Sequence, residues 1–146
     1  MAKPAVVLVG ADKGGVGKTT VSRAVLDYFI AHNIPVRAFD TESPRGTLKR
    51  FHPDVTDVVD ITSTADQMRI FDTLASADAQ VTVIDIRAGL LSTTLKALRD
   101  IGFLDAAAKT QLTFTVTAQQ GTGNYSLAAA RQRDQARRVP FQVGRR

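Results

Sequence analysis

The segment that most constrains the fold is residues 5–29, AVVLVGADKGGVGKTTVSRAVLDYF. Its first seven residues form a continuous apolar run, which predicts a strand covered on both faces as in a parallel sheet. From Lys18 to His32 the apolar residues recur at helical spacing, so an amphipathic helix is expected there. A strand, a glycine-rich turn and a helix in this order indicate an α/β sheet with a ligand site at the carboxyl ends of its strands.

The same alternation continues along the chain and predicts a doubly wound, mostly parallel α/β sheet with helices on both faces. Residues 1–120 are expected to form this core, and residues 121–146 a helix and a basic tail. No further strand is expected after Gln119. The other predicted strands are residues 34–40, 57–62, 80–86 and 110–118. The other predicted helices are residues 65–75, 91–101 and 125–136.

The glycine-rich turn has the composition of a phosphate-binding loop. Glycines let the backbone aim its N–H groups inward, and the helix that follows presents its positive N-terminus. Lys18 is predicted to reach the β- and γ-phosphates, and Thr19 to offer its hydroxyl to Mg²⁺. A purely structural turn is the alternative. The predicted nucleotide-binding residues of this segment are Gly14, Gly15, Val16, Gly17, Lys18, Thr19 and Thr20.

Two acids follow the strand predicted at residues 34–40. Asp40 and Glu42 are spaced i, i+2, so they lie on the same side of an extended chain. Carboxylates beside a triphosphate can assist Mg²⁺ or orient the attacking water. We therefore expect catalytic roles for both acids and a metal-binding role for Asp40. The alternative is that an acid leaving the strand caps the next helix.

A third acid, Asp85, ends an apolar run at the start of VIDIRAGL, residues 83–90. Asp85 has the position of a Walker B carboxylate, which assists Mg²⁺. Gly89 follows four residues later and completes the pattern D-x-x-x-G, the form of a switch loop whose backbone N–H senses a γ-phosphate. We expect Asp85 to be a metal ligand and Gly89 to contact the nucleotide.

The segment KGGVGKT resembles the deviant Walker A motif of the ParA/MinD family of P-loop ATPases. The standard P-loop pattern has glycine where this chain has Asp12, and the family's signature is a lysine at the position of Lys13. The resemblance implies that Lys13 reaches across a dimer interface to the partner's ATP. FDTES resembles the family's second motif, D-x-D-P, with Glu42 as the second acid. Arg87 and Ala88 replace the family's usual T-P-P-like turn.

The resemblance implies a Mg²⁺-ATP-dependent, dimerising switch ATPase with the P-loop NTPase fold. Such proteins act in DNA partition, division-site placement or conjugative transfer. A homodimer formed on ATP binding, nonspecific DNA contact and an activating partner protein are implied. Two alternatives are kept: a biosynthetic P-loop ATP-dependent ligase or synthetase, and a truncated nucleotide-binding module without turnover.

Composition excludes some classes of function. The chain has no cysteine, which excludes thiol catalysis and a cysteine-ligated iron–sulfur cluster. No apolar run reaches the length of a membrane span, so a cytoplasmic protein is expected.

The net charge of +5 lies entirely in residues 131–146, which hold six arginines and one acid. Such a tail can attract nucleic acid or an anionic surface, or it is a solvated end. A membrane-targeting helix is not expected because large apolar residues at helical spacing are lacking and Pro140 interrupts it. Family members are longer, so a naturally short form, a truncated chain and a changed reading frame are all considered.

Overall fold

The computed structural model describes residues 4–11, 17–76, 78–100, 102, 105, 113–120 and 123–126, the last two ranges by their backbone. Within these residues one sheet has strand order β3-β2-β4-β1-β5-β6. β1 to β5 run parallel, and β6 pairs antiparallel with β5. The strands are β1 (Ala5–Ala11), β2 (Val36–Asp40), β3 (Thr56–Val58), β4 (Val81–Asp85), β5 (Thr113–Gln120) and β6 (Gly123–Ser126).

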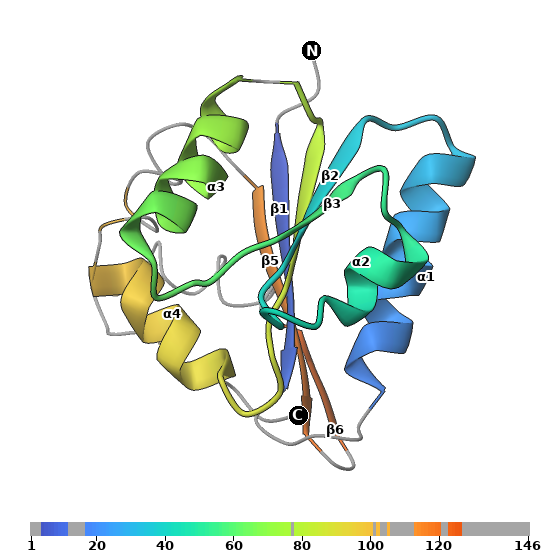
Figure 1. The fold of residues 1–146 in the computed structure, drawn as a ribbon. Coiled ribbons are helices and arrows are strands. Elements are labelled where there is room, and N and C mark those ends of the chain that lie inside the picture. Colours follow the sequence, from blue (N-terminus) through green and yellow to red (C-terminus); the bar gives the residue numbers. More distant parts are fainter. Residues whose placement is uncertain are drawn as a thin grey trace, which may run out of the picture.

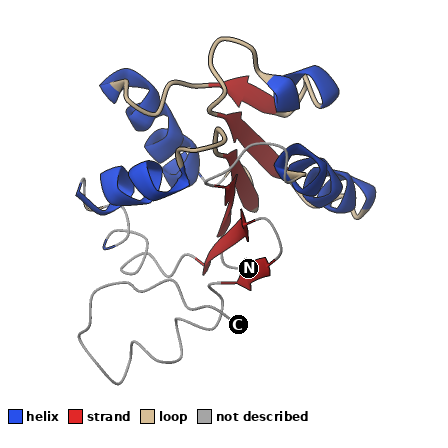
Figure 2. Ribbon diagram, turned by 90° about the horizontal axis from the view of Figure 1, so that it is seen from below, coloured by secondary structure: helices blue, strands red, loops and turns tan. Residues whose placement is uncertain are grey.

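Helices cover both faces of the sheet. The helices are α1 (Lys18–Ala31), α2 (Thr47–Phe51), α3 (Thr64–Ser76) and α4 (Leu91–Asp100). α3 and α4 lie on one face, and α1 and α2 lie on the other (Figures 1 and 2). The predicted doubly wound, mostly parallel α/β fold is therefore confirmed.

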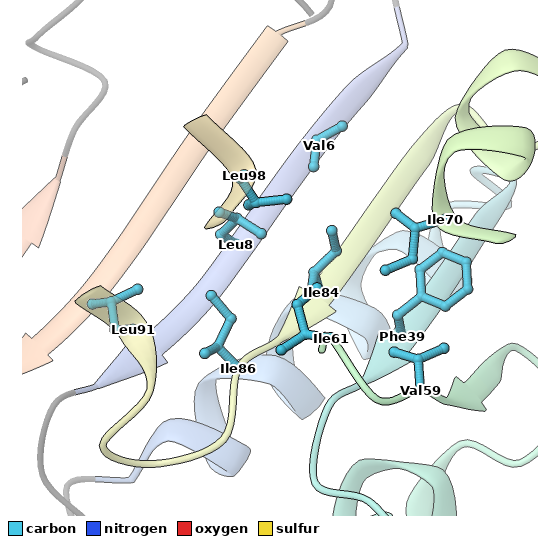
Figure 3. Close-up of a cluster of buried hydrophobic side chains, with 10 residues drawn as sticks. All are labelled: Val6, Leu8, Phe39, Val59, Ile61, Ile70, Ile84, Ile86, Leu91 and Leu98. Carbon is cyan, nitrogen blue, oxygen red and sulfur yellow. The ribbon is translucent and has the colours of Figure 1, made fainter. Parts of the chain in front are cut away.

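Each face of the sheet has its own apolar cluster, because alternate residues of a strand point to opposite sides. On the α3 and α4 side, Leu8, Phe39 and Ile84 belong to a buried cluster (Figure 3). On the other side, Val9 and Val83 pack with Leu26 of α1. β1 is an unbroken apolar run because both of its faces are covered.

The register brings three strand ends to one level. Asp40, the last residue of β2, lies opposite Asp85, the last residue of β4. Asp85 in turn lies opposite Val9, two residues before β1 ends. The two acids and the end of β1 thus lie together at the carboxyl ends of the strands.

Two features depart from the expectations. The strand β6 contradicts the prediction that no strand follows Gln119, and because Tyr125 and Ser126 belong to it, the helix predicted over 125–136 is wrong at its start. Its remainder, and the tail at 131–146, lie outside the described residues. α2 is an unpredicted helix; its five residues are too few to show a helical period.

Gly46 explains how such a short helix begins next to Asp40. Its backbone is left-handed, with φ 60° and ψ 62°. A Cβ atom at this position would lie 2.5 Å from Cγ2 of Val58 and 3.1 Å from Cβ of Lys49. Both the conformation and the space therefore require glycine.

We predict that Gly46→Ala destabilises the protein by roughly 1–3 kcal/mol, because alanine would be strained and would collide with Val58. Urea unfolding followed by circular dichroism would measure the loss. The exposed neighbour Arg45, changed to alanine, is the control and should shift the midpoint little. Equal midpoints for the two variants would contradict the packing described here.

Candidate functional site

The centre of the site is a buried ion pair between α1 and β4. Lys18 Nζ lies 2.5 Å from Oδ1 of Asp85, and the two side chains are 10% and 1% exposed. Ser22, one helical turn after Lys18, donates its hydroxyl to the same oxygen at 3.0 Å and is fully buried. Two side chains of α1 therefore bind one carboxylate oxygen at the end of β4.

Burial raises the pKa of Asp85, because a carboxylate is less stable out of water. The Lys18 charge and the hydrogen bonds from Lys18 and Ser22 act in the opposite direction, and the Asp40 charge adds a further rise. The site thus holds a desolvated negative charge that is stabilised by a neighbouring cation. Such a carboxylate is suited to cations and to oxygen-binding metals.

Asp40 is also fully buried, but its partners are backbone N–H groups. Its Oδ2 accepts from Leu48 at 2.7 Å and from Lys49 at 3.2 Å, in the first turn of α2. Its Oδ1 accepts from the N–H of Glu42 at 2.9 Å. The helix-capping alternative raised from the sequence is thus what the structure displays. The metal-binding and catalytic roles of Asp40 stay predictions.

Glu42 is half-buried and held in the same loop. Its Oε2 accepts a 2.5 Å hydrogen bond from the hydroxyl of Thr47, and its carbonyl accepts the N–H of Gly46 at 2.8 Å. The carboxylate therefore has a defined position near the end of β2. Its predicted role in orienting water stays a prediction.

The D-x-x-x-G segment runs from Asp85 alongside the end of β1. The N–H of Ile86 donates to the carbonyl of Val9 at 2.7 Å, and the N–H of Gly89 donates to the carbonyl of Ala11 at 2.9 Å. Gly89 has φ 81°, a conformation that favours glycine. The amide predicted to sense a phosphate is thus bonded to the last residue of β1, next to the glycine-rich segment.

Two site residues were missed from the sequence, Ser22, which donates to Asp85, and Thr41. Thr41, 6% exposed, bonds through both its N–H and its hydroxyl to the carbonyl of Asp85, each at 3.0 Å. The same hydroxyl accepts the N–H of Arg87 at 2.8 Å. The available sequence signal for Thr41 was a hydroxyl residue between two acids at a strand end. The sequence alone does not say to which neighbouring strand this hydroxyl bonds.

The first turn of α1 carries the remaining described candidates. The helix starts after Gly17, whose φ is 83° and which provides no side-chain cap. Thr19 is half-buried and Thr20 is exposed. Lys13 and its neighbours Gly14, Gly15 and Val16 lie outside the described residues, so their predicted roles stay predictions.

The described residues form neither a metal-binding group of acids, histidines or cysteines nor a membrane-spanning helix. In the part of the chain described, no three His, Cys, Asp or Glu side chains gather into a metal-binding group. None of the described helices is both long enough and apolar enough to span a bilayer.

Comparisons with known proteins add little to this geometry. No protein-family model matches the sequence, and no curated protein matches it. Among solved structures, a nucleotide-binding protein from Archaeoglobus fulgidus in complex with ADP is 14% identical, with a TM-score of 0.41 over 75% of this chain and 63% of its own. The 54 kDa signal recognition particle protein from Aeropyrum pernix, in complex with GDP, is 17% identical, with a TM-score of 0.49 over 92% and 46%.

This chain thus spans less than two thirds of either solved structure. At these identities and TM-scores, what the two proteins bind is a property of theirs alone.

We predict that Asp40→Asn lowers the free energy of unfolding by roughly 2–4 kcal/mol. The amide keeps one acceptor oxygen, so N–H groups of Glu42 or of the first turn of α2 would lose a charged partner. Asp54→Asn, in the exposed turn after α2, is the matched control. Chemical unfolding of both variants measures the difference, and an Asp40→Asn variant as stable as the control would refute the capping role.

Proposed function

We propose that this chain binds Mg²⁺-ATP at the carboxyl ends of β1, β2 and β4, hydrolyses it slowly and uses it as a switch. The observation that carries the proposal is the buried contact between Lys18 and Asp85, 67 residues apart in the sequence. Both residues were predicted independently, one as a phosphate-binding lysine and the other as a metal-binding acid. Their contact supports a single site.

The phosphate-binding part of the proposal rests on the start of α1. The first N–H groups of a helix have no partners within the helix and attract anions. Gly17 leaves these groups without a side-chain cap, and Lys18 adds a positive charge in the same turn. A triphosphate at this point would bind both the amides and the Lys18 ammonium.

The residues present also fit Mg²⁺. This ion prefers oxygen ligands and is commonly held by one or two carboxylates together with substrate phosphates, so a cluster of three acids is unnecessary. The carboxylate of Asp85 and the hydroxyl of Thr19 would hold it. Held there, the ion would supply positive charge that offsets the negative charge developing during phosphoryl transfer. In this proposal Asp40 holds the loop that carries Glu42, and Glu42 positions water.

The switch part of the proposal rests on the resemblance of KGGVGKT to the ParA/MinD motif. Lys13 would contact the ATP of a second copy, so that ATP binding produces a homodimer. DNA partition, division-site placement and conjugative transfer are the processes that this resemblance favours, in the cytoplasm, with nonspecific DNA contact and an activating partner protein. A ligase or synthetase of the same P-loop class would instead turn over ATP only with a small carboxylated substrate.

We predict that Mg²⁺-ATP raises the stability of the wild type by mass action, by about 2.7 kcal/mol at a ligand concentration 100 times Kd. Lys18→Ala should lose most of this increment, because the ammonium that binds phosphate is gone. Thermal unfolding with and without Mg²⁺-ATP measures the increment within each variant, so the lower starting stability of Lys18→Ala does not matter. Lys96→Ala, exposed on α4, is the control.

We also predict that Mg²⁺-ATP converts the wild type from monomer to dimer. Lys13→Ala should remain monomeric while keeping a measurable affinity for ATP, because its ammonium serves the other subunit's nucleotide. Sedimentation velocity, paired with direct nucleotide titration, separates the two effects. An unchanged ATP-induced dimer in Lys13→Ala would refute the switch mechanism, although nucleotide binding itself would stand.

A further inference from the structure

Thr41 joins the two segments that carry the acids of the site. It follows Asp40 and precedes Glu42, and its hydroxyl contacts the backbone on both sides of Ile86: it donates to the carbonyl of Asp85 at 3.0 Å and accepts the N–H of Arg87 at 2.8 Å. β4 ends at Asp85, so Arg87 lies beyond the ladder. The Thr41 side chain therefore holds the backbone of residues 85–87, where the pairing of β4 with its neighbouring strands stops.

The D-x-x-x-G segment is bonded to β1 as well as to Thr41. The N–H of Ile86 donates to the carbonyl of Val9, and the N–H of Gly89 donates to the carbonyl of Ala11. The Gly89 amide would have to leave the carbonyl of Ala11 before it could bind a phosphate. A shift of the segment at Gly89 would then pull on its bond to Thr41.

We infer that Thr41 is a positioning residue whose hydroxyl couples the D-x-x-x-G segment to the Asp40–Glu42 segment, so that the two respond together to the γ-phosphate. The inference rests on the proposed function, because it assigns a role within that same nucleotide site. Thr41 is 6% exposed and is not itself placed against the nucleotide. Its effect would pass through Asp85, Arg87 and Gly89.

Two substitutions separate the hydroxyl from the shape of the side chain. Thr41→Val keeps the branched shape and removes the hydroxyl, whereas Thr41→Ser keeps the hydroxyl. The hydrogen bond between the Arg87 N–H and the Thr41 hydroxyl is only partly buried, so the valine variant should lose one bond of ordinary strength and still fold. The full chain is used throughout.

The first measurement needs no nucleotide. Amide hydrogen exchange at Arg87, followed by NMR, should be roughly 2–10 times faster in Thr41→Val than in the wild type, since one hydrogen bond of ordinary strength is lost. Thr41→Ser should exchange at nearly the wild-type rate. Equal exchange rates in the valine variant and the wild type would overturn the inference.

The second measurement is the ratio of affinities for ATPγS and ADP, both with Mg²⁺. Thr41→Val should reduce this ratio by roughly fivefold or more, a common size for coupling between two sites, and Thr41→Ser should keep it. Faster exchange with an unchanged ratio would reduce Thr41 to a local structural role and overturn the coupling. A wild type that binds neither nucleotide would instead overturn the proposed function, while exchange at Arg87 would still decide whether the hydroxyl holds the segment.

Discussion

The buried carboxylate of Asp85 is the constraint on which the arrangement of the site depends. A negative charge at 1% exposure is costly unless a cation and hydrogen bonds compensate for the lost water. Lys18 and Ser22 provide this compensation from successive turns of one helix, which fixes α1 in rotation and in height against β4. The start of α1 is therefore held at the end of β4 by electrostatics as well as by apolar packing.

Asp40 is a second buried carboxylate, and different partners stabilise its charge. Instead of a cation it uses three backbone N–H groups, two of which begin α2. Hydrogen bonds of this kind stabilise a carboxylate and, at a helix N-terminus, also complement the helix dipole. Two neighbouring acids at one sheet edge are thus held separately, one by a side chain that a ligand could attract and one by fixed backbone.

Prediction of the helices and strands from the sequence succeeded where apolar residues recur at helical spacing or form a long run. The strand that ends at Asp85 and the helix that begins at Lys18 follow from such patterns, as does the doubly wound fold. It failed where tertiary contacts decide. α2 depends on Gly46 and on a cap from Asp40, which lies eight residues before Leu48 in the chain. The role of Thr41 depends on a register between β2 and β4 that no local pattern encodes. The edge strand β6 is only four residues long and pairs with β5.

The short helix α2 gives the site one more property. Its end contacts α1 as well: the guanidinium of Arg23 lies 3.8 Å from the ring centroid of Phe51, and Oδ1 of Asp27 lies 3.2 Å from Nε2 of His52, the residue after α2. A continuous circuit of contacts thus leads from Lys18 to β4, through Thr41 to Asp40, along α2 and back to α1. In a circuit of this kind no single contact contributes to the free energy of unfolding independently of the others, because neighbouring groups that share partners do not contribute additively. The site is therefore better regarded as one cooperative unit than as three motifs placed side by side.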